Sequence, residues 1–406
     1  MPGYEPSRLD RRALVATGFA LSALCYGLVF QLEPDFALKA PFGRDFLNFW
    51  MGGHLTLEGR AADLMRPETY ERAARAVFHY GNDHFLFSYP PPILPLLIPF
   101  GAAPYVVALV AWTLLNFVGL AAAAKLLSRD GRTALAACLS PAAFVMALYG
   151  HFGGALAFLG TFALTRAEAR PRLAGGALAL IAVKPQIAAA LAVLLLLGGR
   201  WRPDLWAVPP GLALAALATA VVGLEPWRGY FEWVAPYQTR LLTDLRLNEL
   251  KTVVSPFVGL RRAGLGFAPA LAGQAVFSAV VVAGGALRLR RAAAAGRLDA
   301  GEVATLLLAA LLALPYANHY DLAMAAPALA VALLRPAPDG RPPLLRPLPG
   351  LVLWLTPLLA MPNGFRAFPL AIALLCGFTL WLSFSRMPPQ AMCGEHEKGP
   401  PASRRP

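Results

Sequence analysis

The stretch YVVALVAWTLLNFVGLAAAAKL, residues 105–126, decides the fold, because its only charged residue, Lys125, lies at its end. About 20 helical residues cross the roughly 30 Å hydrocarbon core of a bilayer, so this run predicts a transmembrane helix. Similar runs recur along the 406 residues, which are 57% hydrophobic and only 15% charged. A soluble domain carries about 25% charged residues. The sequence therefore predicts an all-α, polytopic membrane protein.

Basic residues gather in short segments between the apolar runs and give a net charge of +13. Clusters of this kind are typical of cytoplasmic loops and do not favour nucleic-acid binding. If every cluster is cytoplasmic, both termini are cytoplasmic and an even number of crossings separates each cluster from the next. This interpretation predicts about twelve crossings, at 13–32, 105–126, 133–149, 151–166, 172–184, 185–199, 205–223, 268–287, 301–316, 320–335, 345–361 and 365–385.

The pattern predicts one transmembrane domain, residues 1–386, followed by a disordered, polar cytoplasmic tail at 387–406. Large extracytoplasmic loops with their own helices are expected at about 33–84 and 225–267. In the first loop, a helix with Tyr70, Ala74, Val77 and Phe78 on one side is expected to lie on the membrane. The proline-dense segment YPPPILPLLIPF, 89–100, predicts a re-entrant or interfacial piece, because proline interrupts the helical hydrogen bonds.

This topology brings polar residues from several turns of an apolar chain to the extracytoplasmic face. Ionisable groups within such a chain are costly and usually mark pathways, ion pairs or sites. The candidates are Arg44, Asp45, His54, Tyr89, His151, Lys184, Gln186, Asn318, His319, Tyr320 and Asp321. Lys184 can also be a lysine that extends to the lipid headgroups. Asp321 is expected to cap the helix that follows it, which would make His319 an ordinary interfacial histidine.

Asp45 is the sharpest candidate for chemistry. A carboxylate at the membrane edge, next to Arg44, is expected to be partly desolvated, which raises its pKa toward that of a general base. The aromatic residues Phe46, Phe49 and Trp50 are expected to anchor this segment at the membrane surface. The alternative is an ordinary loop acid paired with Arg44, which contributes little when exposed.

Five motifs in order resemble the integral-membrane glycosyltransferases of the GT-C class, and most closely family 87. They are RDFLNFWMGGHLTLEG (44–59), FSYPPPILPLL (87–97), YGHFGGALAFLGTFAL (149–164), AVKPQIAAALAVLLLLGGRWR (182–202) and LPYANHYDLAMAAPAL (314–329). The resemblance implies a polyprenyl-phosphate-mannose-dependent enzyme that performs a single inverting displacement without a nucleotide. It implies a lipid-linked sugar donor and a glycolipid or glycan acceptor.

By position, the resemblance makes Asp45 the catalytic base. It places Lys184 and His319, with Arg44, near the donor phosphate, and His54, Tyr89, His151, Gln186, Asn318 and Tyr320 near the substrates. The sequence departs from the family pattern at three positions. His151 stands at a usual Gln, Gly154 at a usual Asn, and Phe49 at a common Tyr.

We expect no cofactor and no metal ion, because no acidic cluster suggests one. We expect the bacterial inner membrane, with the active site on its extracytoplasmic side. Three other functions stay open from the residues: a transporter or flippase of a lipid-linked sugar, a related enzyme that uses another polyprenyl-phosphate sugar, and an inactive scaffold. Few charges within the spans and no evident inverted repeat argue against transport.

Overall fold

A computed structural model of the chain describes residues 43–78, 87–244, 253–294, 298–334 and 353–357, with residue 20 and isolated positions between 373 and 381. Regular structure in these residues is helical, apart from one isolated bridge between Val253 and Asn318. The predicted all-α class is therefore confirmed for the described part of the chain. The predicted crossings at 13–32 and 365–385, most of the one at 345–361, and the tail after 386 lie outside it.

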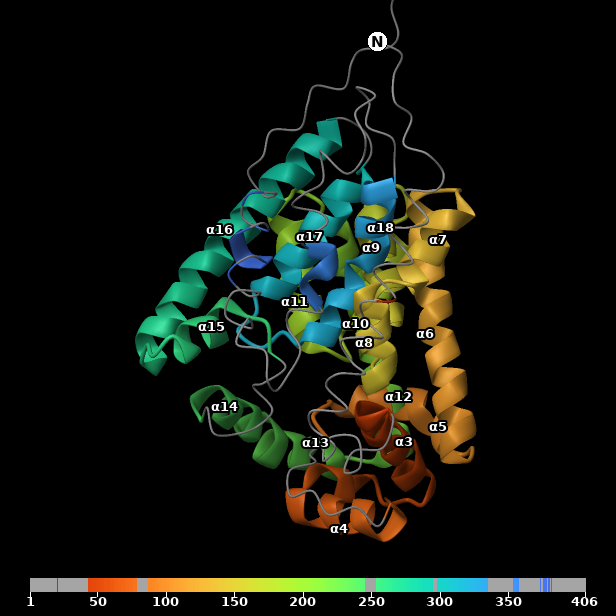
Figure 1. The fold of residues 1–406 in the computed structure, drawn as a ribbon. Helices are drawn as coiled ribbons and strands as arrows, with labels where there is room; N and C mark the ends of the chain where they lie inside the picture. Colours follow the sequence, from red (N-terminus) through yellow and green to blue (C-terminus); the bar gives the residue numbers. More distant parts are fainter. Residues whose placement is uncertain are drawn as a thin grey trace, which may run out of the picture.

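The helices form two tiers, one above the other in Figure 1. The upper tier contains α7 (Gly131–Cys138), α8 (Pro141–Tyr149), α9 (Gly153–Arg166), α10 (Pro171–Ile181), α11 (Pro185–Leu197), α17 (Ala300–Leu312) and α18 (Ala326–Leu334). The lower tier contains α3 (Arg44–Leu57), η1 (Ala61–Met65), α4 (Pro67–Phe78), α5 (Leu94–Gly101), α13 (Glu225–Gly229), the π-helix η3 (Tyr230–Val234) and α14 (Ala235–Thr243). Two further short elements are α15 (Pro256–Arg262), which precedes α16 (Phe267–Ala294) in the chain, and η5 (His319–Met324), which lies between α17 and α18.

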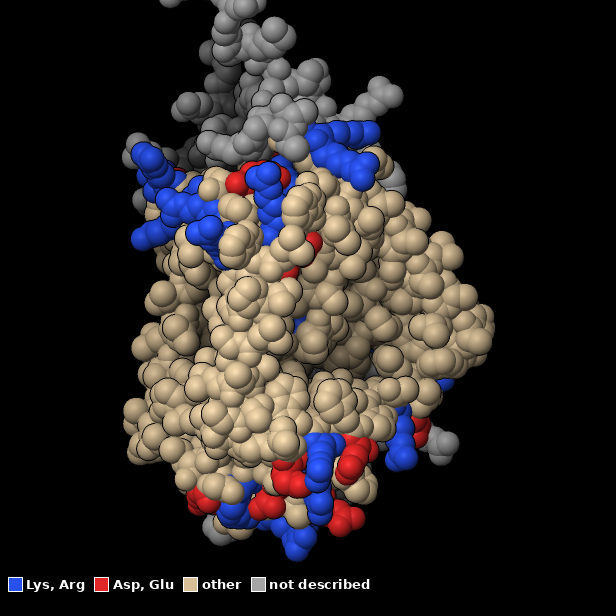
Figure 2. Space-filling view, turned by 180° about the vertical axis from the view of Figure 1, so that it is seen from behind, with Lys and Arg blue, Asp and Glu red and all other residues tan. Residues whose placement is uncertain are grey.

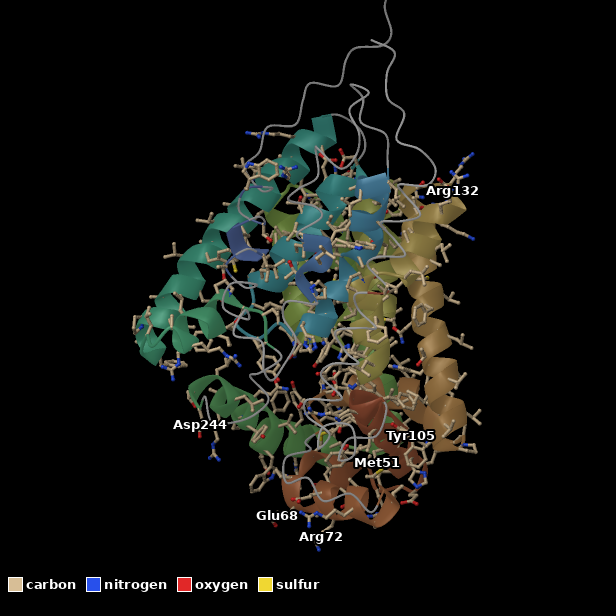
Figure 3. The ribbon with its side chains drawn as sticks, in the orientation of Figure 1. Met51, Glu68, Arg72, Tyr105, Arg132 and Asp244 are labelled. Carbon is tan, nitrogen blue, oxygen red and sulfur yellow. The ribbon has the colours of Figure 1, made fainter. Side chains whose placement is uncertain are left out.

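Three described helices are long and apolar enough to cross a membrane: α6 (Tyr105–Leu127), α12 (Arg202–Val222) and α16 (Phe267–Ala294). The pair α7 and α8, bent by 50°, can form a fourth, broken span. Figure 3 shows Tyr105, at the start of α6, in the lower tier and Arg132, just beyond its end, at the top. The helix quoted first therefore runs from the lower tier up along the side of the upper tier.

The charged side chains lie at the two ends of the molecule. On the face shown in Figure 2, Lys, Arg, Asp and Glu gather at the top and bottom, and a broad belt between them is almost free of charge. Exposed leucine and valine side chains of α6 and α12 contribute to the uncharged surface. A belt of this kind matches the hydrocarbon core of a bilayer, because apolar side chains can face lipid without loss.

The predicted number of about twelve crossings is not confirmed. Four of the predicted crossings correspond to helices of 11 to 14 residues, which are α9, α10, α11 and α17. At 1.5 Å per residue, such helices are about 16 to 21 Å long and do not cross a bilayer by themselves. They pack together as the centre of the upper tier.

The lower tier is built from the two predicted loops. In the first loop the expected amphipathic helix is present as α4, where Tyr70 and Ala74 are buried but Val77 is 40% exposed. In the second loop, helices α13, η3 and α14 follow one another, and Gln238 of α14 donates to the Ser88 carbonyl at 2.7 Å. This bond ties the second loop to the start of the proline-rich segment.

The proline-rich segment forms the short helices η2 (Pro91–Ile93) and α5, of which α5 packs against α3 and η2 against α12. Glycines permit the close contact, because a Cβ atom on Gly53 would come within 2.2 Å of the Leu97 carbonyl oxygen. The Trp50 indole donates to the Ala103 carbonyl just beyond α5, at 2.9 Å. The proline-rich piece therefore supports the helix that carries Asp45; its re-entrant position in a membrane stays a prediction.

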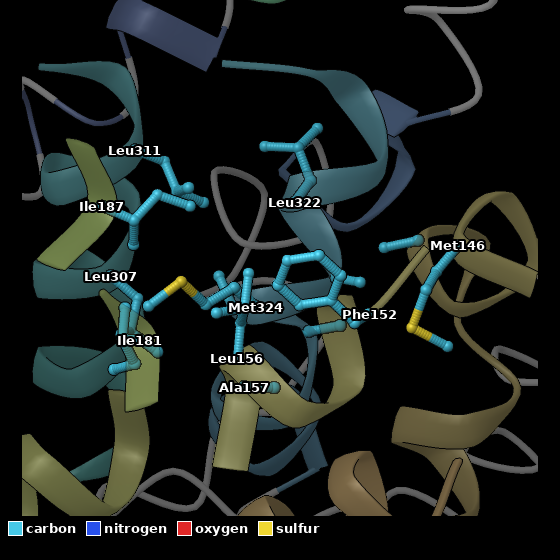
Figure 4. Close-up of a cluster of buried hydrophobic side chains, with 14 of the residues drawn as sticks. Met146, Phe152, Leu156, Ala157, Ile181, Ile187, Leu307, Leu311, Leu322 and Met324 are labelled. Atoms are coloured by element: carbon cyan, nitrogen blue, oxygen red, sulfur yellow. The ribbon is translucent and has the colours of Figure 1, made fainter. Parts of the chain in front are cut away.

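A buried apolar cluster lies where α8, α9, α10, α11, α17 and η5 meet. Figure 4 shows its side chains, among them Met146, Phe152, Leu156, Ile181, Ile187, Leu307, Leu311, Leu322 and Met324. Phe152 and Leu322 directly follow His151 and Asp321 in the chain, so the cluster fixes the turns that carry polar residues. Full burial of such side chains supplies about 1.5–3 kcal/mol each relative to exposure to water.

Candidate active site

Polar side chains from five separate segments meet at the boundary of the two tiers. They come from the first turn of α3, the residue before the proline-rich helices, the turn between α8 and α9, the turn between α10 and α11, and η5. The residues brought together are Asp45, Tyr89, His151, Lys184, Tyr320 and Asp321. The fold brings these segments together, because each adjoins a helix that packs in the apolar core.

Lys184 lies at the centre of this group. It precedes Pro185, which begins α11, and its ammonium is buried although the side chain comes from a turn. Its Nζ atom lies 2.6 Å from Oδ1 of Asp321. The rings of Phe152 and Tyr320 flank the ammonium, with centroids at 5.4 and 5.3 Å. A lysine that extends to lipid headgroups would be exposed, so the described geometry excludes that alternative.

Asp321 is among the polar candidates, but the sequence-based prediction assigns it only a capping role. Its Oδ2 atom accepts the backbone N–H of Asn318 at 3.2 Å, and the Asn318 side chain accepts the N–H of Asp321. The two residues form a capping box at the start of η5, in which Asn318 is the N-cap and Asp321 the third helical residue, so the prediction of Asp321 as the N-cap is wrong. The ion pair with Lys184 spans 137 positions in sequence, and no local pattern predicts it.

His151 is held between aromatic rings. Its imidazole stacks on Tyr320 at 4.1 Å and on Phe152 at 4.6 Å between centroids. Nε2 is 3.0 Å from the Tyr89 hydroxyl, and Nδ1 is 3.9 Å from Oδ1 of Asp321. His151 therefore links the proline-rich segment to the Lys184–Asp321 pair.

Asp45 lies in the first turn of α3, with 17% of its side chain exposed. The α3 start is fixed because the Gly43 N–H donates to the Leu148 carbonyl at 3.1 Å. Burial raises the pKa of the Asp45 carboxyl above its ordinary value, and Arg44, Lys184 and the Tyr320 hydroxyl oppose part of that rise. The Arg44 Nε atom is 4.0 Å from Oδ1, which is too long for a hydrogen bond. Asp45 is a carboxylate that can accept a proton.

The expected membrane anchor is wrong. Phe46 and Phe49 are fully buried and Trp50 is 7% exposed, so these rings face protein and not lipid. Phe46 and Phe49 pack on Trp112 of α6, and Phe49 also contacts Tyr89 and Phe152. The aromatic residues after Asp45 thus attach α3 to α6 and to the site.

The remaining candidates differ in their distance from this group. His319 is buried, and its ring meets Tyr149 edge-on at 4.9 Å. Gln186 is exposed at the start of α11. His54 is not brought to Asp45, because nine residues of helix separate them by about 13 Å along its axis. It stacks on Trp50, lies 3.3 Å from Glu58 and lines a surface pocket between α3, η1 and α4.

The departure at Gly154 has a steric cause. A Cβ atom at Gly154 would lie 1.9 Å from the Asn116 carbonyl oxygen on α6, so a side chain does not fit there. The Asn116 side chain instead accepts the N–H of Ala155 at 3.1 Å, in the first turn of α9. An amide group is thus present beside this turn, but α6 supplies it and it serves the helix end.

Comparisons with known proteins identify the family. The model of glycosyltransferase family 87 matches residues 87–315 of the 406. The match includes Tyr89, His151 and Lys184, whereas Asp45 and Asp321 lie outside it. No curated protein sequence and no solved structure matches the chain. Among the described residues, no group of three or more His, Cys, Asp and Glu side chains is placed to hold a metal ion. The chain belongs to glycosyltransferase family 87 and is a membrane glycosyltransferase.

Proposed function

We propose that this glycosyltransferase moves a hexose, in the first instance mannose, from a polyprenyl-phosphate sugar to an acceptor hydroxyl. The acceptor is a glycolipid or a glycan on the extracytoplasmic side of the bacterial inner membrane. The observation that carries the proposal is the convergence of Asp45 and Lys184 at the boundary of the tiers. Asp45 can accept a proton, and Lys184 can bind a phosphate.

The reaction is a single inverting displacement. The acceptor oxygen forms a bond to the anomeric carbon, and the bond from that carbon to the phosphate oxygen breaks. Asp45 takes the proton of the acceptor hydroxyl as it attacks, which suits a carboxyl whose pKa is raised by burial. The leaving group departs as a polyprenyl phosphate with growing negative charge on its oxygens. Lys184, supported by Arg44 and His319, stabilises that charge.

The position of the site supports a donor that stays in the membrane. The site lies between the tier that contains the apolar helices and the tier of short loop helices, and Figure 2 shows the uncharged belt hollowed on that face. A lipid chain can remain in the bilayer while its phosphate and sugar reach the boundary. The basic turns that contain Arg132, Arg166, Arg200 and Arg288 support a cytoplasmic position for the opposite end.

The test is transfer of labelled sugar in membranes of the native host that lack this protein. Purified wild type is added back with polyprenyl-phosphate-mannose labelled in the sugar, beside Asp45→Asn and Asp63→Asn. Asp63 is a matched control, because it is a partly exposed carboxylate of η1 paired with Arg60. We expect a new labelled glycolipid or glycan of inverted configuration with wild type and Asp63→Asn only.

Other results separate the alternatives. Transfer only from a different polyprenyl-phosphate sugar would change the donor and keep the reaction. If wild type moves label from none of a panel of such donors, but speeds their passage across vesicle membranes, the chain is a flippase of the lipid-linked sugar and the proposal is wrong.

A further inference from the structure

The two carboxylates near Lys184 are bound to different degrees. Both oxygens of Asp321 are engaged, Oδ1 with the lysine ammonium and Oδ2 with the Asn318 N–H. Its side chain is only 4% exposed, and the capping box of η5 fixes its backbone. These contacts fix the Asp321 carboxylate beside Lys184.

Lys184 has more donors than Asp321 uses. An ammonium carries three N–H groups, and the hydrogen bond to Asp321 takes one of them. The aromatic rings of Phe152 and Tyr320 flank the ammonium and stabilise its charge without saturating its donors. Such an arrangement fixes the direction of the ammonium while it leaves hydrogen-bonding capacity for an anion.

We propose that Asp321 is a positioning residue that directs the Lys184 ammonium at the donor phosphate. The phosphate shares the ammonium with Asp321 and does not displace it, because the capping box holds the carboxylate in place. This inference rests on the proposed function, and it adds a residue to which that function gives no role. The proton balance of the displacement is unchanged, since the proton of the acceptor hydroxyl goes to Asp45.

Several other groups lie near Lys184. They are Asp45 from α3, His151 from the turn between α8 and α9, and the Tyr320 ring from η5. Among the contacts that the structure describes, Asp321 alone forms a direct ion pair with the ammonium. Without Asp321, nothing in this group fixes the direction of the buried ammonium toward the donor phosphate.

The experiment measures kcat and the donor KM of purified wild type and Asp321→Asn. We expect the donor KM of Asp321→Asn to rise by about tenfold, because the ammonium is no longer directed at the phosphate. Asp63→Asn should keep the wild-type donor KM.

A merely structural role would lower kcat through the active fraction and leave the donor KM unchanged. If Asp321→Asn keeps the donor KM of wild type, the inference is wrong and the proposed function stands. If wild type transfers no sugar from any donor, the proposed function is wrong and the inference falls with it.

A second variant covers the case in which Asp321→Asn does not fold. Asp321→Glu keeps the charge and moves it by one methylene, so we expect a donor KM raised by about tenfold, since small misplacements at a site are costly. A donor KM equal to that of wild type would overturn the inference.

Discussion

The first turn of α3 and the η5 turn each bring a carboxylate to Lys184, and they hold it in opposite ways. Asp321 in η5 is 4% exposed, with a hydrogen bond on each oxygen. Asp45 in α3 is 17% exposed, and its nearest Arg44 nitrogen is 4.0 Å away. Asp45 also has a side-chain hydrogen bond with Tyr320, but burial raises its pKa, which suits a base. Asp321 forms the direct ion pair with Lys184, which suits a positioning role.

Removal of Lys184, the cation near both carboxylates, should have the largest effect. In Lys184→Met, Asp321 remains buried without its partner, and we expect the free energy of unfolding to fall by about 3–5 kcal/mol. Transfer by the folded fraction should fall by about 10²–10³-fold, because the leaving phosphate loses its cation. Denaturant unfolding and initial rates check both effects. Lys125→Met, an exposed lysine of α6, is the control and should change neither.

The pH dependence of wild type sharpens the difference between the two acids. The base must be ionised, so transfer should fall by about tenfold per unit as the pH drops below the raised pKa of Asp45. Arg44 lowers that pKa, so Arg44→Gln should shift this acid limb to higher pH. A profile of kcat/KM for each protein checks the direction. An acid limb that moves to lower pH in the variant would show that Asp45 is not the group that titrates.

The turn that carries His151 should depend on the crossing of α6 and α9. Gly154→Ala places a Cβ atom 1.9 Å from the Asn116 carbonyl oxygen, so the helices must separate. We expect a loss of about 1–3 kcal/mol in the free energy of unfolding. Gly176→Ala on α10 meets no atom within 4 Å and should leave the stability unchanged or slightly raised. If Gly154→Ala and Gly176→Ala are equally stable, the close contact between α6 and α9 at Gly154 is wrong.

The smallest effect is expected at His54, which lies on the same helix as Asp45 but outside the polar group. Its partial exposure and its pairing with Glu58 predict a change in stability below about 1 kcal/mol for His54→Ala. Transfer rates should stay within about twofold of wild type, as for most surface substitutions. A large rise in the acceptor KM would instead place the surface pocket beside His54 in the path of the acceptor.

The sequence predicted the membrane class and several residues of the polar group, because apolar runs and isolated ionisable residues are local signals. It did not predict the Lys184–Asp321 pair, which joins turns 137 positions apart. It misplaced the rings of Phe46, Phe49 and Trp50, because an aromatic side chain suits both a membrane interface and a protein interior. Four helices of 11 to 14 residues were also predicted as crossings, whereas in the structure they are too short to cross a bilayer and pack together in the upper tier.

The most direct measurement of the central claim compares kcat for Asp45→Asn and wild type, purified in the same detergent, with a thermal unfolding curve for each. Asparagine keeps the shape of the side chain and cannot take the proton, so the account predicts a loss of about 10²–10⁴-fold in kcat. Because burial raises the pKa of Asp45, its ionised form is disfavoured in the folded protein, and the contribution of this group to stability is lost as the pH rises through that pKa. The unfolding temperature of the variant at neutral pH should therefore equal or exceed that of wild type. A variant that is folded and transfers sugar at the wild-type rate would contradict the assignment of Asp45 as the base.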